Sequence, residues 1–221
     1  MLTANSLTVS RGERILFRNL SFSLASGEAL ALTGANGAGK TSLLRTLAGF
    51  IRPDAGTVAF GEDFVENSAT RSGDTTGTTE TSPPAAPADR RSEDIHWLGH
   101  LDGLKGARTA RDELTFQAQW LGADVDGIAA AVDVLALKPL LDLEVRMLSA
   151  GQRRRLAFAR LIAAPRPIWL LDEPFAPLDA RWRAALGLLM QAHIDKGGGI
   201  IAAVHDPLPV AARAIDIGAG R

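Results

Sequence analysis

The sequence predicts a single α/β domain, and three observations lead to that prediction. An apolar run at residues 30–33 is typical of a buried strand, and a glycine-rich loop and a helical pattern at residues 42–48 follow it. A second apolar run, at residues 168–173, ends in two carboxylates. The chain has 221 residues, which is enough for one α/β domain with its own core. We therefore expect residues 1–221 to form one domain.

The glycine-rich loop indicates a phosphate-binding site. Its glycines let the backbone turn with the N–H groups facing inward, and the helix N-terminus that follows also favours an anion. Lys40 can reach terminal phosphates, and the Thr41 hydroxyl can ligate Mg²⁺. The alternative is a glycine-rich turn with an incidental lysine, but the flanking strand and helix argue against it. The predicted phosphate-binding residues are Gly34, Ala35, Asn36, Gly37, Ala38, Gly39, Lys40 and Thr41.

Composition excludes several classes of protein. The net charge is -1, so bulk electrostatics gives no reason to expect nucleic-acid binding. The absence of cysteine excludes disulfides and zinc–thiolate sites within this chain. No apolar run approaches the roughly 20 residues that span a bilayer, and the first residues lack the features of a signal peptide. We expect that any membrane role depends on a partner.

The segments around the loop are predicted to be short strands. Residues 7–9 and 20–24 alternate between apolar and polar residues, and residues 57–60 follow a turn signal. Arg11 and Phe17 are both candidates for contact with a purine base, and core packing is the alternative for Phe17.

Residues 66–94 depart from the rest of the chain in composition. They are rich in Ser, Thr, Gly, Pro and Ala, with few large apolar side chains. Such a segment cannot bury enough apolar surface to offset the entropy of ordering it. We predict a disordered surface insertion and assign it no function.

Three helices are predicted between this insertion and the carboxylate pair. The first begins after a candidate N-cap, Thr109, and the second covers residues 128–137 and ends near Pro139. The third begins at residue 149, so that Ser149 lies at a helix N-terminus, which attracts anions. An N-capped helix without further function is the alternative. The arginines early in this helix, Arg153 and Arg154, are expected on a solvated face.

The two carboxylates at the end of the apolar run can take different roles. Consecutive strand residues point to opposite faces, so Asp172 can hold Mg²⁺ while Glu173 orients or deprotonates a water molecule. A loop and a helix at residues 180–196 follow, and a strand at residues 200–204 ends at His205. A histidine there can sense the γ-phosphate, although alone it would more often be a satisfied polar residue.

Taken in order, these stretches resemble the ATP-binding cassette (ABC) ATPases over nearly the whole chain. Residues 34–41 are similar to the Walker A motif, and residues 168–173 are similar to Walker B with the catalytic glutamate. Asp179 resembles the D-loop aspartate, and His205 resembles the switch histidine. Residues 149–152 are similar to the family signature, and in this chain they are Ser149, Ala150, Gly151 and Gln152. Ala150 stands where glycine is commoner in the family.

This resemblance implies a P-loop NTPase core, a small antiparallel β-subdomain and a helical subdomain at about residues 101–147. It implies an ATPase that uses ATP and Mg²⁺, with Mg²⁺ held by Thr41 and Asp172. Catalytic roles are implied for Lys40, Glu173 and His205. It further implies a homodimer in which each ATP lies between the Walker A loop of one chain and the signature of the other.

A narrower resemblance rests on His100, which stands where most cassettes carry glutamine. With the short length and the sequence of residues 148–161, it resembles the ATP-binding subunits of cytochrome c maturation systems, which are often called haem exporters. That resemblance implies an integral membrane permease partner and a peripheral location on the cytoplasmic face of the bacterial inner membrane. Whether His100 acts in catalysis or in coupling stays open. The insertion at residues 66–94 departs from the compact family pattern.

Three alternatives compete with this interpretation. The first is the ATP-binding subunit of an ABC transporter for another substrate, which only the partner distinguishes. The second is a soluble cassette ATPase outside transport, although those usually carry two cassettes in one chain. The third is an inactive adenylate-binding regulator, and the presence of Lys40 and Glu173 argues against it. His96 and His193 lack partners at ligand spacing, so no direct haem binding is expected.

Overall fold

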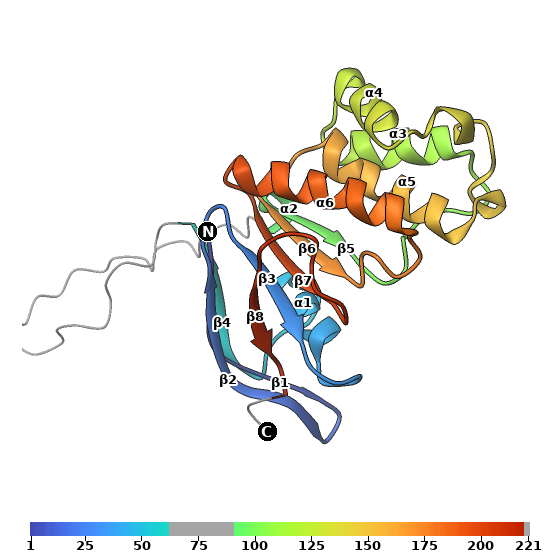
Figure 1. The fold of residues 1–221 in the computed structure, drawn as a ribbon. Coiled ribbons are helices and arrows are strands. Elements are labelled where there is room, and N and C mark those ends of the chain that lie inside the picture. The colour runs from blue at the N-terminus through green and yellow to red at the C-terminus, as the bar shows by residue number, and fades with distance from the viewer. Residues whose placement is uncertain (62–90, 219–221) are drawn as a thin grey trace, which may run out of the picture.

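Two β-sheets and a group of helices make up the computed structural model, which describes residues 1–61 and 91–218 (Figure 1). The strands are β1 (Leu2–Arg11), β2 (Arg14–Leu24), β3 (Ala29–Thr33), β4 (Ala55–Phe60), β5 (Ile95–Leu98), β6 (Ile168–Asp172), β7 (Gly199–Ala203) and β8 (Arg213–Asp216). The α-helices are α1 (Lys40–Leu47), α2 (Arg91–Asp94), α3 (Ala110–Trp120), α4 (Val125–Val134), α5 (Ala150–Ala163) and α6 (Ala180–Asp195). Two 3₁₀ helices are η1 (Lys138–Leu140) and η2 (Val145–Met147).

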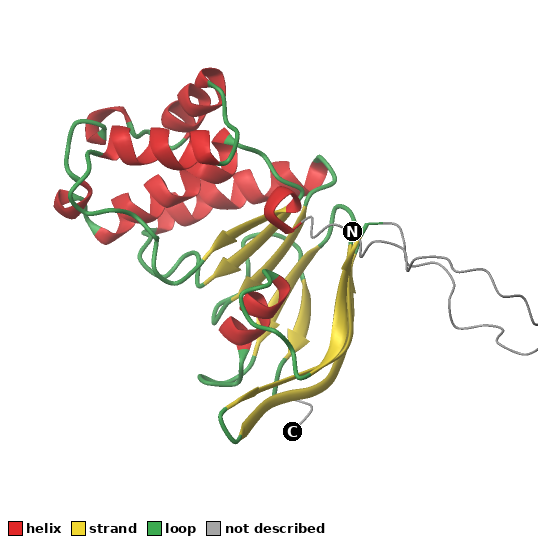
Figure 2. Cartoon of the chain, turned by 180° about the vertical axis from the view of Figure 1, so that it is seen from behind, coloured by secondary structure: helices red, strands yellow, loops and turns green. Residues whose placement is uncertain are grey.

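The strands form one antiparallel and one parallel sheet. The antiparallel sheet has the order β2-β1-β4, and the parallel sheet has the order β5-β6-β7-β3-β8. The helices α3, α4, α5 and α6 gather at one end of the molecule, and the antiparallel sheet lies at the other (Figure 2). The predicted α/β class is confirmed, although β1 and β2 are longer than the strands predicted at residues 7–9 and 20–24.

The parallel sheet separates two hydrophobic cores. Its central strands are buried on both faces, which explains why they appear as continuous apolar runs in the sequence. In β6, Trp169 and Leu171 belong to the core shared with the large helices, whereas Ile168 and Leu170 belong to the core shared with α1 and the antiparallel sheet. A one-residue shift in register would exchange these two sets of side chains.

The helix boundaries follow local capping. Helix α1 begins at Lys40, two residues earlier than predicted, and Gly49 follows its C-cap with a φ of 82°. Thr109 caps α3 as predicted, because its side chain accepts from Asp112 N. Helix α4 begins earlier than the predicted residue 128 because Asp124 caps it, and Pro139 lies in η1.

Helices α3 and α4 lie within the expected helical subdomain at residues 101–147, but they pack on α5, which comes later in the chain. Of the predicted disordered insertion, residues 66–90 lie outside the described residues. Residues 91–94 form helix α2, so the prediction of disorder is wrong for this segment. Arg91 explains part of the difference, because its Nε donates to the carbonyl oxygen of Leu47 at the end of α1.

Candidate active site

The glycine-rich loop joins β3 to α1 and depends on its glycines. Gly34, Gly37 and Gly39 have φ values of 127°, 74° and 113°, which side-chain-bearing residues rarely adopt. A Cβ atom on Gly39 would also lie 3.1 Å from Leu16 Cβ and 3.2 Å from Phe17 Cδ1. The loop therefore needs glycine at residue 39 for both its conformation and its packing.

Lys40 points back over this loop. Its side chain is buried, and Nζ donates to the carbonyl oxygens of Gly34 at 2.7 Å and Ala35 at 3.3 Å. No carboxylate within the described residues forms an ion pair with it. The loop thus holds a cation whose charge no neighbouring acid cancels, which favours an anion.

A cavity of about 200 Å³ lies over the loop. Its walls include Arg11, Leu16 and Glu173 in addition to the loop itself. Phe17 is buried, and it packs in the core under Gly39. Of the two candidates for contact with a base, the structure therefore brings only Arg11 to the cavity.

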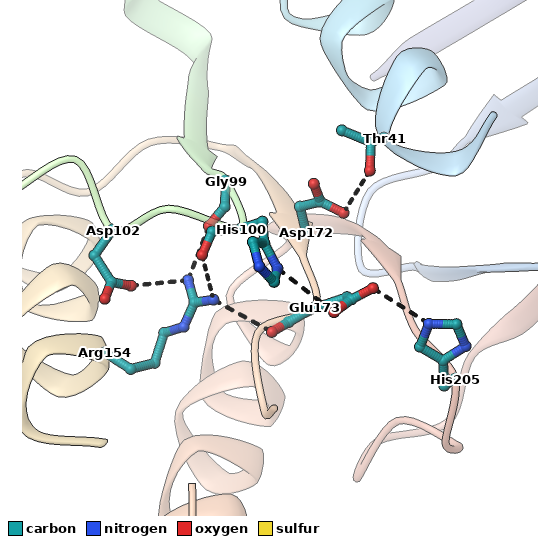
Figure 3. A network of polar contacts seen from close by, with 8 residues as sticks. All are labelled: Thr41, Gly99, His100, Asp102, Arg154, Asp172, Glu173 and His205. Carbon is teal, nitrogen blue, oxygen red and sulfur yellow. Dashed lines mark hydrogen bonds and ion pairs between the residues drawn. The ribbon is translucent and has the colours of Figure 1, made fainter. Parts of the chain in front are cut away.

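Thr41 and Asp172 meet beside the loop. The Thr41 hydroxyl donates to Asp172 Oδ1 at 3.1 Å, and Asp172 ends strand β6 (Figure 3). Burial raises the pKa of the Asp172 carboxyl above its ordinary value, and the hydrogen bond from Thr41 opposes this effect. A hydroxyl and a carboxylate are the oxygen ligands that Mg²⁺ prefers, so this pair fits the predicted metal ligands.

Glu173 lies between two histidines. Its Oε1 is 3.2 Å from His205 Nε2, and its Oε2 is 3.5 Å from His100 Nδ1 (Figure 3). The structure corrects the prediction that Glu173 is the last strand residue, because β6 ends at Asp172 and Glu173 has a φ of 49°. This left-handed conformation is uncommon outside glycine and turns the carboxylate away from the strand direction.

The order of the parallel strands explains why these residues meet. Neighbouring strands β5, β6, β7 and β3 all present their carboxyl ends at one edge of the sheet. His100 follows β5, the two carboxylates end or follow β6, His205 follows β7, and the glycine-rich loop follows β3. The sheet thereby brings together segments that are far apart in the sequence, from the loop at residues 34–41 to His205.

The segment at residues 149–152 forms the N-terminus of α5, away from the cavity over the loop. Ser149 and Gln152 form a capping box, with Gln152 N donating to Ser149 Oγ at 3.2 Å and Ser149 N donating to Gln152 Oε1 at 2.7 Å. A Cβ atom on Gly151 would lie 3.0 Å from the Pro177 carbonyl oxygen. The start of α5 therefore packs against the loop that precedes α6, and Asp179 caps α6 by accepting from Trp182 N.

Comparison with known proteins decides the family. Residues 17–176 match the family model described as "ABC transporter". The chain belongs to the ABC transporter family. Two curated relatives are each named "Cytochrome c biogenesis ATP-binding export protein CcmA". The relative from Rhodopseudomonas palustris (strain BisB5) is 44% identical over 99% of this chain and 98% of its own length. The relative from Maricaulis maris (strain MCS10) is 43% identical over 100% and 93%.

Solved structures of ABC proteins share the fold. The ATP-binding subunit of an ABC transporter has a TM-score of 0.75 and 20% identity, covering 93% of this chain and 79% of that one. The dimeric structure of a bacterial ABC transporter cassette has a TM-score of 0.76 and 18% identity, covering 99% and 95%. The predicted fold and ATPase class are confirmed, and this ABC protein binds nucleotide. None of its described helices is long and apolar enough to cross a membrane.

In this ABC ATPase, the first two arginines of α5 are less exposed than the sequence predicts. The sequence predicts a solvated face for Arg154, but its side chain is buried. Arg153 is partly buried, and its guanidinium donates to the Leu148 carbonyl oxygen. The spacing of apolar residues in the sequence does indicate that Arg154 faces the core. It shares one helical face with Ala157 and Phe158, three and four residues later, and both are core residues.

Proposed function

We propose that this protein is the ATP-hydrolysing subunit of an exporter in cytochrome c biogenesis. The observation that carries the proposal is the meeting of Lys40, Asp172 and Glu173 at one edge of the parallel sheet. The names of the curated relatives support the assignment to export in cytochrome c biogenesis, and haem is the cargo that we propose. The residues present fit a phosphate group and a divalent cation on chemical grounds.

The geometry supports a role for each of these residues. Lys40 and the backbone N–H groups of the loop bind the phosphates, and Thr41 with Asp172 holds Mg²⁺. Bound Mg²⁺ would neutralise charge that develops on the phosphates. Glu173 orients the attacking water and accepts its proton, while His205 holds one carboxylate oxygen of Glu173. His100 is placed to contact the other oxygen.

We further propose a homodimer with two ATP sites. The start of α5 offers N–H groups and a helix dipole to an anion, yet residues 149–152 do not line the cavity of their own chain. A second copy can supply this helix terminus to the nucleotide of the first. The dimeric cassette structure with the same fold supports this arrangement.

A groove beside α3 is a candidate binding site for a membrane partner. It has a volume of about 500 Å³, and its walls include the aromatic residues Phe50, Trp97 and Trp120 together with Arg160 and Arg166. No acidic side chain lines it among the described residues. We propose that it receives a short helix of the integral membrane subunit, with an apolar face and an acidic residue. The ATPase would then be a peripheral protein on the cytoplasmic face of the inner membrane.

Affinity purification from membranes tests this assignment. The intact chain should hydrolyse ATP and co-purify with integral membrane subunits of a cytochrome c biogenesis system. Trp120→Ala should reduce this co-purification while ATP binding stays unchanged, because Trp120 is 82% exposed at the groove. Leu188→Ala, at an exposed position on α6, is the matched control and should have no effect. Recovery of the subunits of a different transporter would overturn the assignment.

A further inference from the structure

The guanidinium of Arg154 lies between segments that are far apart in the sequence (Figure 3). Its Nη1 donates to the Gly99 carbonyl oxygen at 2.9 Å and lies 3.1 Å from Asp102 Oδ1. Its Nη2 donates to the carbonyl oxygens of His100 and Glu173, each at 3.4 Å. One side chain of α5 therefore contacts both the loop after β5 and the residue that follows β6.

The burial of Arg154 is costly and requires an explanation. Its side chain is 3% exposed, and burial lowers the pKa of its guanidinium, an effect that Asp102 opposes. Ala157 and Phe158 show that an apolar residue on this helix face can pack into the core. Since a buried ion pair is often no more stabilising than apolar residues of similar volume, packing alone does not explain an arginine here.

The contact with Glu173 is at its backbone, which sets the direction of the carboxylate. Glu173 has a left-handed φ of 49°, a conformation that surrounding contacts must hold in place. Its N–H donates to the Ala203 carbonyl oxygen at 3.0 Å, and its own carbonyl oxygen accepts from Arg154 Nη2 and from Ala176 N, each at 3.4 Å. Strand β7 and helix α5 thus hold the backbone of Glu173 from its two ends.

We propose that Arg154 is a positioning residue for ATP hydrolysis. It fixes the backbone of Glu173 and the loop that carries His100 relative to each other, with Asp102 as its counterion. The proposal rests on the proposed role of Glu173 as the general base. Two terminal nitrogens are needed, because Nη1 serves Gly99 and Asp102 while Nη2 serves Glu173. A lysine carries one nitrogen and cannot serve both sides.

The first test replaces the arginine while keeping its charge. Arg154→Lys should lower kcat about tenfold or more, since small displacements of a catalytic group are costly. Its KM for MgATP and its affinity for a fluorescent ATP analogue should stay close to those of the unmodified protein. Its melting temperature should fall by only a few degrees, because buried carbonyl oxygens lose a donor, so kcat is measured well below the unfolding transition. The matched control is Arg155→Lys, because Arg155 donates to the Leu135 carbonyl oxygen and stacks on Trp182. That control should keep full kcat.

A double-mutant cycle tests whether Arg154 acts through Glu173. In the Glu173→Gln background, Arg154→Lys should lower kcat far less than it does alone, because the group that it positions is already removed. If Arg154→Lys does not fold, the pair Arg154→Met with Asp102→Asn leaves no buried charge unpaired and should show the same loss of kcat.

The outcomes separate this inference from the proposed function. Normal kcat in folded Arg154→Lys, or equal fold-losses with and without Glu173→Gln, would overturn the positioning role while leaving Glu173 as the base. A loss of kcat that only follows a lower folded fraction would also overturn it. Normal turnover in Glu173→Gln alone would instead remove the base on which the inference rests.

Discussion

Glu173 and His205 follow adjacent parallel strands, and their side chains meet with Oε1 and Nε2 3.2 Å apart. Neither residue lies within its strand, since β6 ends at Asp172 and β7 ends at Ala203. The pair therefore depends on the register of the two strands and on the turn at Glu173. Because the pairing of β6 with β7 is fixed by side chains in two cores, the cores determine the geometry of the site.

Glu173→Gln should bind ATP but hydrolyse it slowly. A positioned general base contributes roughly 10²–10⁴-fold in rate, and the amide cannot accept the proton. With ATP present the variant should accumulate as a dimer, which size-exclusion chromatography with light scattering measures. Near-normal ATP turnover would exclude Glu173 as the base.

Lys40→Ala should weaken nucleotide binding itself. The variant removes the buried cation that points over the glycine-rich loop, so the phosphates lose a charged donor. Titration with a fluorescent ATP analogue measures the loss of affinity. Lys196→Ala, at the exposed C-cap of α6, is the control and should bind as the unmodified protein does. Equal affinities for the two variants would contradict the role of Lys40.

His100→Ala and His100→Gln together separate catalysis from coupling. His100 Nδ1 lies 3.5 Å from Glu173 Oε2, so a catalytic role should be visible in the isolated subunit. We expect the alanine variant to lose ATPase activity and the glutamine variant to retain most of it, because an amide can also donate and accept hydrogen bonds. If the isolated alanine variant keeps full activity and only the complex with membrane subunits is impaired, His100 acts in coupling.

His96 should make the free energy of unfolding decrease as the pH is lowered. This histidine is buried in β5, and its Nε2 bonds to the Ala164 carbonyl oxygen. Burial lowers its pKa to about 4, from an ordinary value near 6.5. Between pH 6.5 and pH 4, His96 is therefore protonated in the unfolded chain but neutral in the folded chain. Its contribution to the free energy of unfolding is fully present above pH 6.5 and is lost as the pH falls towards 4. The loss is about 3 kcal/mol at most.

His96→Gln provides the comparison for this pH effect, because glutamine does not titrate and can still donate to Ala164. Urea denaturation at pH 7, 6 and 5 should show the unmodified protein losing stability relative to the variant as the pH falls. His193, whose pKa burial also lowers, is present in both proteins, so the effect of its own burial is common to the two. Parallel dependence on pH in the two proteins would show that His96 makes no such contribution.

The sequence by itself determined the α/β class, the glycine-rich loop between a strand and a helix, and the cap of α3, because each depends on residues close together in the chain. Glycine spacing, capping side chains and apolar runs act locally, so their consequences can be inferred without the fold.

Only the tertiary structure decided how distant segments meet. It showed that Phe17 is a core residue, that Glu173 lies beyond its strand in a left-handed conformation, and that the charge of Arg154 is buried against Asp102. These features depend on which strands become neighbours and on which face of a helix meets the sheet. Such contacts are set by the packing of two cores over the whole chain. The local spacing of Arg154 from Ala157 and Phe158 indicates a core-facing helix position, but it does not identify the distant residues that Arg154 meets there.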